Sequence, residues 1–247
     1  MAELKSMIAL SMHKAGSSIA DRILMNFVAA RGYEIDRISQ QVPHSPLPEA
    51  EIYEGYQSRM KPNGVYYGMA RGPYVANMPI IGRLRTIVQL RDPRDCITSA
   101  YFSFRESHVP PKDPTKLAEF QKRRAALQEL DIDSYATSRA AQYRMRMQIL
   151  ARIIAAHDDV LVLRYEEMVE DTERWLGRIA AFLDQPVTAE LRAQLGSKID
   201  FSVAREDSAR HKRQVRPGDH LRKLRPESIA AMTAVLKDEL DRFGYAA

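Results

Sequence analysis

Short apolar runs alternate with longer amphipathic stretches along this chain, and this alternation restricts the fold more than any other feature. The clearest runs are residues 7–10, 86–90 and 160–163. Their length and continuous apolar character are typical of strands that are buried on both faces. Parallel strands need a crossover connection, which is usually a helix. We therefore expect an α/β fold with a central, mostly parallel sheet flanked by helices.

The remaining segments extend this pattern. Residues 33–38 predict a shorter strand, and three prolines predict a loop at residues 43–48. The secondary structure of residues 64–72 is ambiguous from the sequence. A polar, basic stretch at residues 202–223 is expected to be mobile or ordered by a ligand. Apolar residues recur with helical spacing in residues 18–30, 93–104, 115–130, 134–156, 172–183, 189–195 and 226–242.

Composition sets broad limits. With 247 residues, of which 45% are hydrophobic and 28% charged, the chain is expected to form one domain spanning residues 1–247. The net charge of +5 suits an anionic ligand, a nucleic acid or a membrane surface. A single cysteine, Cys96, excludes a disulfide within the chain and fits a reducing compartment. Because there is no signal-peptide pattern and no run of 18 apolar residues, we expect a cytoplasmic protein without a membrane span.

Polar clusters follow the three clearest strands, at residues 11–18, 91–95 and 164–167. In open parallel sheets, ligands bind in the crevice beyond the carboxyl ends of the strands. We therefore expect these three clusters to contribute to one ligand site.

The first cluster has the features of an anion site. Lys14-Ala15-Gly16-Ser17-Ser18 stands between a strand and a helix, where backbone N–H groups and the helix dipole favour negative charge. Lys14 adds a positive charge and the serines add hydrogen-bond donors. The alternative is an ordinary turn in which Ser17 or Ser18 caps the helix. The segment is not a Walker A loop, because Lys14 precedes the glycine.

The other clusters carry further motifs. Arg91-Asp92-Pro93-Arg94-Asp95 is followed by Ser99, eight residues after Arg91. We expect Pro93 to begin a helix and Arg94 to be a solvated charge at the helix end. The third cluster is Leu163-Arg164-Tyr165-Glu166-Glu167-Met168, and further along the chain come Phe201 and the stretch from Arg213 to Asp219.

These motifs, in this order, resemble those of the sulfotransferases that use 3′-phosphoadenosine 5′-phosphosulfate (PAPS) and release 3′-phosphoadenosine 5′-phosphate (PAP). The resemblance implies a P-loop-like, three-layer fold similar to that of nucleotide kinases. It places the 5′-phosphosulfate at Lys14, Ala15, Gly16, Ser17 and Ser18. It places the 3′-phosphate at Arg91, Ser99 and Arg213, and the adenine at Tyr165 and Phe201. This chain departs from the family pattern at Gln214 and Val215, where the family has lysine and glycine, and at Ile19, where it has a tryptophan.

The implied reaction moves a sulfuryl group from PAPS to an acceptor hydroxyl or amine. Lys14 is expected to stabilise the negative charge that builds on the bridging oxygen of the leaving phosphate. A general base must accept the proton of the acceptor. The histidine that many family members carry before the second motif is absent, so His44 is the first candidate, followed by Glu49 or Glu51 and then His108.

The acceptor is not readable from the sequence: a small molecule, lipid, glycan or peptide all remain open, as does pairing with a second copy of the chain. Residues 43–56 and 109–135 are expected to shape its pocket. We expect no metal and no nucleic-acid partner. Two rival functions remain, a nucleotide-dependent phosphotransferase, which would need Mg²⁺, and a non-catalytic protein that binds RNA or another anion through the basic stretch.

Overall fold

The computed structural model describes residues 4–201 and 215–245. The chain divides into two compact units. The sheet unit comprises Met1–Leu90 and Ile149–Phe201, and the helical unit comprises Arg91–Gln148 and Ser202–Ala247.

The sheet unit is built on five strands: β1 (Met7–Ser11), β2 (Glu34–Ile35), β3 (Val65–Ala70), β4 (Arg85–Leu90) and β5 (Val160–Arg164). Their order across the sheet is β2-β3-β1-β4-β5, and every neighbouring pair is parallel. All residues of β1 and β3 are buried, as expected for strands covered on both faces. The predicted α/β fold with a parallel central sheet is confirmed.

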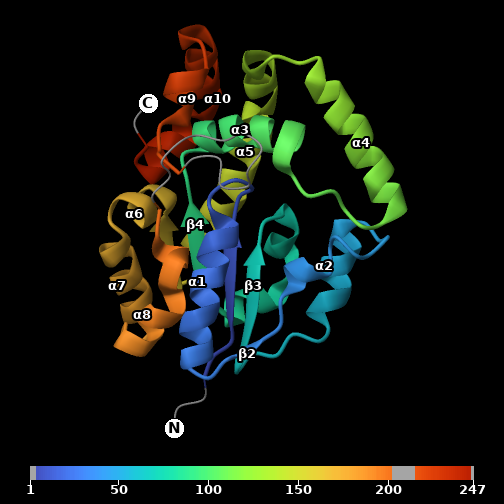
Figure 1. Cartoon of the computed structure of the whole chain (residues 1–247). Coiled ribbons are helices and arrows are strands. Elements are labelled where there is room, and N and C mark those ends of the chain that lie inside the picture. The colour runs from blue at the N-terminus through green and yellow to red at the C-terminus, as the bar shows by residue number, and fades with distance from the viewer. Residues whose placement is uncertain (1–3, 202–214, 246–247) are drawn as a thin grey trace. The chain divides into compact units, whose positions relative to one another are not determined.

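Helices cover the sheet. The sheet unit contains α1 (Ser17–Ala30), α2 (Glu49–Gln57), the end of α5 (Ile132–Ala156), α6 (Tyr165–Glu170), α7 (Thr172–Leu183) and α8 (Ala189–Leu195), with single 3-10 turns η1 (Ile38–Gln40), η2 (Pro73–Asn77), η3 (Pro79–Arg83) and η5 (Gly196–Ile199). Figure 1 shows α1 in front of the strands. The apolar face of α1, with Leu24 and Phe27, joins Trp175 of α7 and Leu191 of α8 in one buried core.

The helical unit contains α3 (Pro93–Phe102), a π-helical segment η4 (Ser103–Ser107), α4 (Pro114–Gln128), most of α5, α9 (Asp219–Lys223) and α10 (Pro226–Phe243). Local sequence explains where α3 begins. Asp92 is its N-cap and accepts a hydrogen bond from the backbone N–H of Arg94 at 2.9 Å, and Pro93 occupies the first helical turn.

Several local expectations were wrong. The short helix α2 was not predicted, because only Ile52, Tyr53 and Tyr56 form its buried face. The strand expected at residues 33–38 is limited to Glu34–Ile35, whereas the ambiguous region contains a complete strand, Val65–Ala70. The helix expected to reach residue 104 is α-helical only to Phe102. Part of the basic stretch forms α9, and its residues 202–214 lie outside the described ranges.

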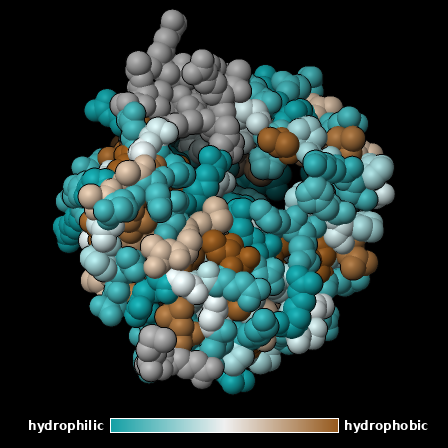
Figure 2. All heavy atoms as spheres, turned by 60° about the horizontal axis from the view of Figure 1, so that its bottom comes forward, coloured by the Kyte–Doolittle hydropathy of each residue, from teal (hydrophilic) through white to brown (hydrophobic). Residues whose placement is uncertain are grey.

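Within residues 4–201 and 215–245, no helix is both long and apolar enough to cross a bilayer. The face drawn in Figure 2 is mainly hydrophilic, with hydrophobic residues in small separate groups. Single exposed apolar side chains of this kind are normal on folded proteins and need no partner.

Candidate functional site

The loop between β1 and α1 has an unusual backbone. Lys14 and Gly16 both adopt left-handed conformations, with φ angles of 70° and 71°. The hydroxyl of Ser11 donates to the carbonyl of Gln89 at 2.9 Å, which ties the end of β1 to the end of β4. The loop therefore begins at the carboxyl edge of the sheet, where the sequence placed it.

Gly16, and not a serine, is the N-cap of α1. Its carbonyl accepts hydrogen bonds from the backbone N–H groups of Ile19 and Ala20 at 3.1 and 3.0 Å. No side chain caps the helix, so the alternative in which Ser17 or Ser18 is the N-cap is wrong. The first N–H groups of an α-helix have no acceptor within the helix. In α1 the N–H of Ile19 is taken up by the carbonyl of Gly16, and the N–H groups of Ser17 and Ser18 at the start of the helix are the ones suited to an anion.

Arg71 completes this loop, although no motif in the sequence indicates it. Its Nε donates to Ser17 Oγ at 2.7 Å and its Nη2 to Ser18 Oγ at 3.3 Å. Arg71 follows the last residue of β3, and β3 pairs with β1, so the sheet brings it to the start of α1. The only available signal was an arginine directly after a possible strand.

The charge of Arg71 has no carboxylate partner among the described residues. Its hydrogen bonds are to the two serine hydroxyls. Burial lowers the pKa of Arg71, and the charge of Arg37 lowers it further, against the opposite effect of Asp21. A partly buried cation in these surroundings favours a bound anion, because the anion supplies the missing countercharge.

Tyr165 packs directly against the loop. A Cβ atom on Gly16 would lie only 2.5 Å from Cδ2 of Tyr165 and 3.0 Å from Cε of Met168. Tyr165 is 5% exposed and belongs to the apolar core, against which Phe201 also packs. The first and third motifs are thus in contact, and the tyrosine ring supports the glycine of the loop.

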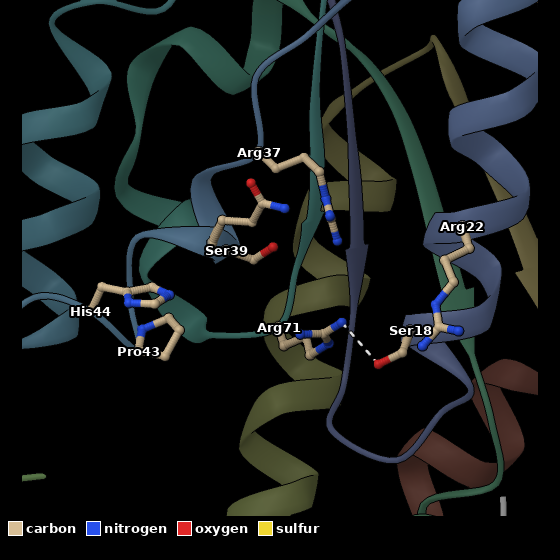
Figure 3. Close-up of a pocket in the computed structure, with 8 residues that line it drawn as sticks. Ser18, Arg22, Arg37, Ser39, Pro43, His44 and Arg71 are labelled. Atoms are coloured by element: carbon tan, nitrogen blue, oxygen red, sulfur yellow. Dashed lines mark hydrogen bonds between the residues drawn. The ribbon is translucent and has the colours of Figure 1, made fainter. Parts of the chain in front are cut away.

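A pocket of about 660 Å³ opens beside the loop. Ser18 and Arg22 of α1 line one side, Arg37, Ser39 and His44 line the other, and Arg71 lies between them (Figure 3). His44, the first candidate for the general base, is exposed and contributes to this lining.

The other candidate bases lie elsewhere. Glu49 is half-buried in the first turn of α2, with Oε1 3.0 Å from the position that a Cβ on Gly72 would occupy. Glu51 lines a separate, smaller pocket. In the helical unit, the ring of His108 packs against Phe104 at a centroid distance of 4.7 Å.

In the helical unit, Arg91 takes part in a buried polar cluster around Asp95. This carboxylate is fully buried and accepts four hydrogen bonds, from Arg91 Nη2 (3.2 Å), the backbone N–H of Gly218 (2.8 Å), the backbone N–H of His220 (3.0 Å) and His220 Nδ1 (2.7 Å). Asp95 therefore links the second motif to the end of the fourth. No local pattern indicates this role, because Gly218 and His220 lie more than 120 residues further along the chain.

Electrostatics keep Asp95 ionised. Burial by itself raises its pKa, but the hydrogen bonds from His220 and the charge of Arg91 outweigh burial and hold the pKa well below the ordinary value. Arg94 is also buried, with 5% exposure, and pairs with Asp92 at 2.8 Å. The expectation that Arg94 is a solvated surface charge is therefore wrong.

The predicted site residues fall into two groups. The sheet unit brings together Lys14, Ala15, Gly16, Ser17, Ser18 and Tyr165, with His44 on the adjoining pocket. The helical unit holds Arg91 and the half-buried Ser99 on α3 or immediately before it. Arg213 lies outside the described residues. Across residues 4–201 and 215–245, no group of three or more His, Cys, Asp or Glu side chains is placed to bind a metal.

Known structures share this arrangement of strands and helices. The mouse sulfotransferase SULT7A1 complexed with PAP superposes with a TM-score of 0.64 at 17% sequence identity, over 96% of this chain and 84% of that one. Retinol dehydratase in a complex with retinol and PAP gives a TM-score of 0.55 at 16% sequence identity, over 97% of this chain and 82% of that one. The sulfotransferase domain from the curacin biosynthetic pathway gives 0.51 at 13% identity, over 99% of both chains. At these identities the likeness concerns the fold alone.

An α/β fold with a loop of this geometry after its first strand is typical of proteins that bind phosphorylated ligands at the carboxyl ends of the strands. Residues 80–241 match the sulfotransferase domain family. No curated protein sequence matches the chain significantly. The chain belongs to the sulfotransferase domain family, and it is an enzyme that transfers a sulfuryl group from PAPS.

Proposed function

We propose that the loop Lys14–Ser18 binds the 5′-phosphosulfate of PAPS and that the acceptor binds in the adjoining pocket, from which a hydroxyl or amine attacks the sulfur. The observation that carries this proposal is the loop itself: an uncapped helix N-terminus with Lys14 in front of it and Arg71 bound to both serines. The mouse sulfotransferase and retinol dehydratase structures both contain PAP, which supports the same nucleotide here.

The other motifs are assigned to the rest of the nucleotide. Arg91 is suited to the 3′-phosphate because a guanidinium can bind two phosphate oxygens at once. Ser99 and Arg213 are proposed to share this phosphate, and Phe201 and Tyr165 to border the adenine. Asp95 is a positioning residue, because it holds Arg91 and the backbone of Gly218 through direct hydrogen bonds.

In the reaction, the acceptor oxygen or nitrogen forms a bond to sulfur while the bond between sulfur and the bridging phosphate oxygen breaks. PAP leaves with that oxygen, and Lys14 and Arg71 stabilise the negative charge that develops there. The proton of the acceptor passes to a general base, for which we propose His44. Positioning and charge stabilisation account for most of the rate in transfers of this kind.

Nucleotide binding tests the proposal first. PAP should raise the melting temperature without Mg²⁺, and the intact protein should transfer labelled sulfuryl groups from PAPS to acceptors. Lys14→Ala should abolish most transfer, whereas Lys122→Ala, which removes an exposed lysine on α4, should not. Mg²⁺-dependent hydrolysis of ATP with no response to PAP would instead favour a phosphotransferase.

The base is tested by two variants. His44→Ala should lower the turnover number by about a hundredfold while PAP binding is preserved. Glu49→Gln is the matched comparison, and a loss in that variant alone would transfer the role to Glu49. The cytoplasmic location remains an expectation that cell fractionation can test.

A further inference from the structure

The lining of the pocket beside the loop is strongly basic. It includes Arg22, Arg37 and Arg71, together with His44, and no aspartate or glutamate. Ser18 and Ser39 add hydroxyl groups. Figure 3 shows the three arginines entering from different elements, with Arg71 between His44 and Ser18.

Two of these three arginines form no ion pair with the described residues, whereas Arg37 is paired with an aspartate. Arg22 is exposed and its side chain forms no ion pair or hydrogen bond with the described residues. Among the described residues, the guanidinium of Arg71 donates hydrogen bonds to two serine hydroxyls and pairs with no carboxylate. Arg37 pairs with the fully buried Asp21 at 2.7 Å, and its partly exposed side chain lines the pocket. Arg22 and Arg71 therefore bring positive charge to the pocket that no carboxylate of the described residues pairs with.

The spacing along α1 separates two subsites. Ser18 belongs to the proposed phosphosulfate loop, and Arg22 is four residues further along the same helix. Side chains four residues apart lie on one face of a helix, about 6 Å apart along its axis. A group bound by Arg22 and Arg37 would therefore lie about one helical turn beyond the donor end of the pocket.

We propose that the acceptor carries an anionic group, a carboxylate, phosphate or sulfate, that binds Arg22 and Arg37 while its hydroxyl or amine faces the loop at Ser18 and Arg71. This inference rests on the proposed function, because it takes the loop as the donor site. An anionic group can form charge-assisted hydrogen bonds with Arg22, which is exposed and pairs with no carboxylate of the described residues, whereas a neutral acceptor cannot. The anion serves to orient the acceptor and plays no part in bond breaking.

Binding to PAP-saturated protein tests this assignment, because PAP occupies the donor site. Three hydroxyl-bearing anions are compared with neutral counterparts: 4-hydroxybenzoate with 4-hydroxybenzamide, glucuronate with glucose, and glycerol 3-phosphate with glycerol. Each is titrated calorimetrically into the wild type, Arg22→Gln and Arg152→Gln. Arg22 is exposed and unpaired, so its replacement should leave the fold intact, and Arg152→Gln removes an exposed arginine of α5 outside the pocket.

We expect at least one anion to bind wild type more tightly than its neutral counterpart, and Arg22→Gln to weaken that binding at least tenfold while Arg152→Gln leaves it unchanged. The inference is overturned if no anion is preferred, including the case in which none binds, or if the preference survives in Arg22→Gln. Failure of PAP itself to bind would instead overturn the proposed function. The two failures are therefore distinguishable.

Discussion

The contact between Gly16 and Tyr165 leads to a quantitative prediction for Gly16→Ala. An alanine at φ 71° meets the penalty of the left-handed region, about 1–2 kcal/mol. Its Cβ would also lie 2.5 Å from Cδ2 of Tyr165, a ring that is 5% exposed and enclosed by core side chains. Forcing extra volume into a packed core costs about 1–3 kcal/mol.

Together the two effects should lower the free energy of unfolding by about 2–5 kcal/mol. For a chain of this size, that corresponds to a fall of roughly 4–20 °C in Tm. The same displacement should weaken PAP binding, because the loop that precedes α1 must move away from the tyrosine. Thermal unfolding with and without PAP measures both effects.

Gly32→Ala is the matched control. Gly32 also has a positive φ, 89°, but a Cβ there would meet nothing within 4 Å. It should lose only the backbone contribution of about 1–2 kcal/mol and bind PAP normally. Equal losses of stability in the two variants would refute the idea that close packing of Tyr165 adds to the cost at Gly16.

Two further predictions concern charged groups. Lys14→Gly should relieve the strain of the left-handed backbone at φ 70°. The free energy of unfolding should therefore stay unchanged or rise by up to about 1 kcal/mol, while sulfuryl transfer falls sharply. A parallel fall in Tm and activity would contradict this prediction. Asp95→Asn should lower the stability at pH 7 by roughly 3 kcal/mol, the cost of breaking a buried ion pair. Because the pKa of Asp95 is depressed, its contribution is complete above the unfolded value of about 3.9 and is lost as the pH falls through the lower folded value. Unfolding curves measured from pH 7 to acid should therefore show that the difference in free energy of unfolding between wild type and Asp95→Asn shrinks only below about pH 4. A difference that disappears near neutral pH would exclude this explanation.

Much of the fold could be predicted because its signals are local. Strands buried on both faces appear as continuous apolar runs, and β1 and β4 were found in this way. The run at residues 160–163 also marks a strand, β5, but this strand lies at the edge of the sheet and only Leu163 is buried. Helix α2 was missed because it is short and weakly amphipathic, and β3 stayed ambiguous because its tyrosines and glycine fit several conformations. Local patterns are weak where a segment gains its stability from tertiary packing.

The candidate site also has one part that is visible in the sequence and another part that only the structure reveals. The anion loop at residues 14–18 was visible in the sequence because its chemistry lies in five consecutive residues. Arg71 was not visible, because it reaches Ser17 only through the pairing of β3 with β1. Asp95 looked like an ordinary charge at a helix end until His220 and Gly218 were found to donate to it.

The sequence by itself determined the class of fold, the order of the motifs and the family. It could do so because apolar runs, helix-start residues and short motifs are patterns of neighbouring residues. Only the tertiary structure decided what surrounds the loop. It placed Arg71 on the serines, Tyr165 against Gly16, and three arginines around one pocket without an acidic side chain. These relations join residues that are distant in the chain, and the sheet order that brings them together is set by packing of the whole core.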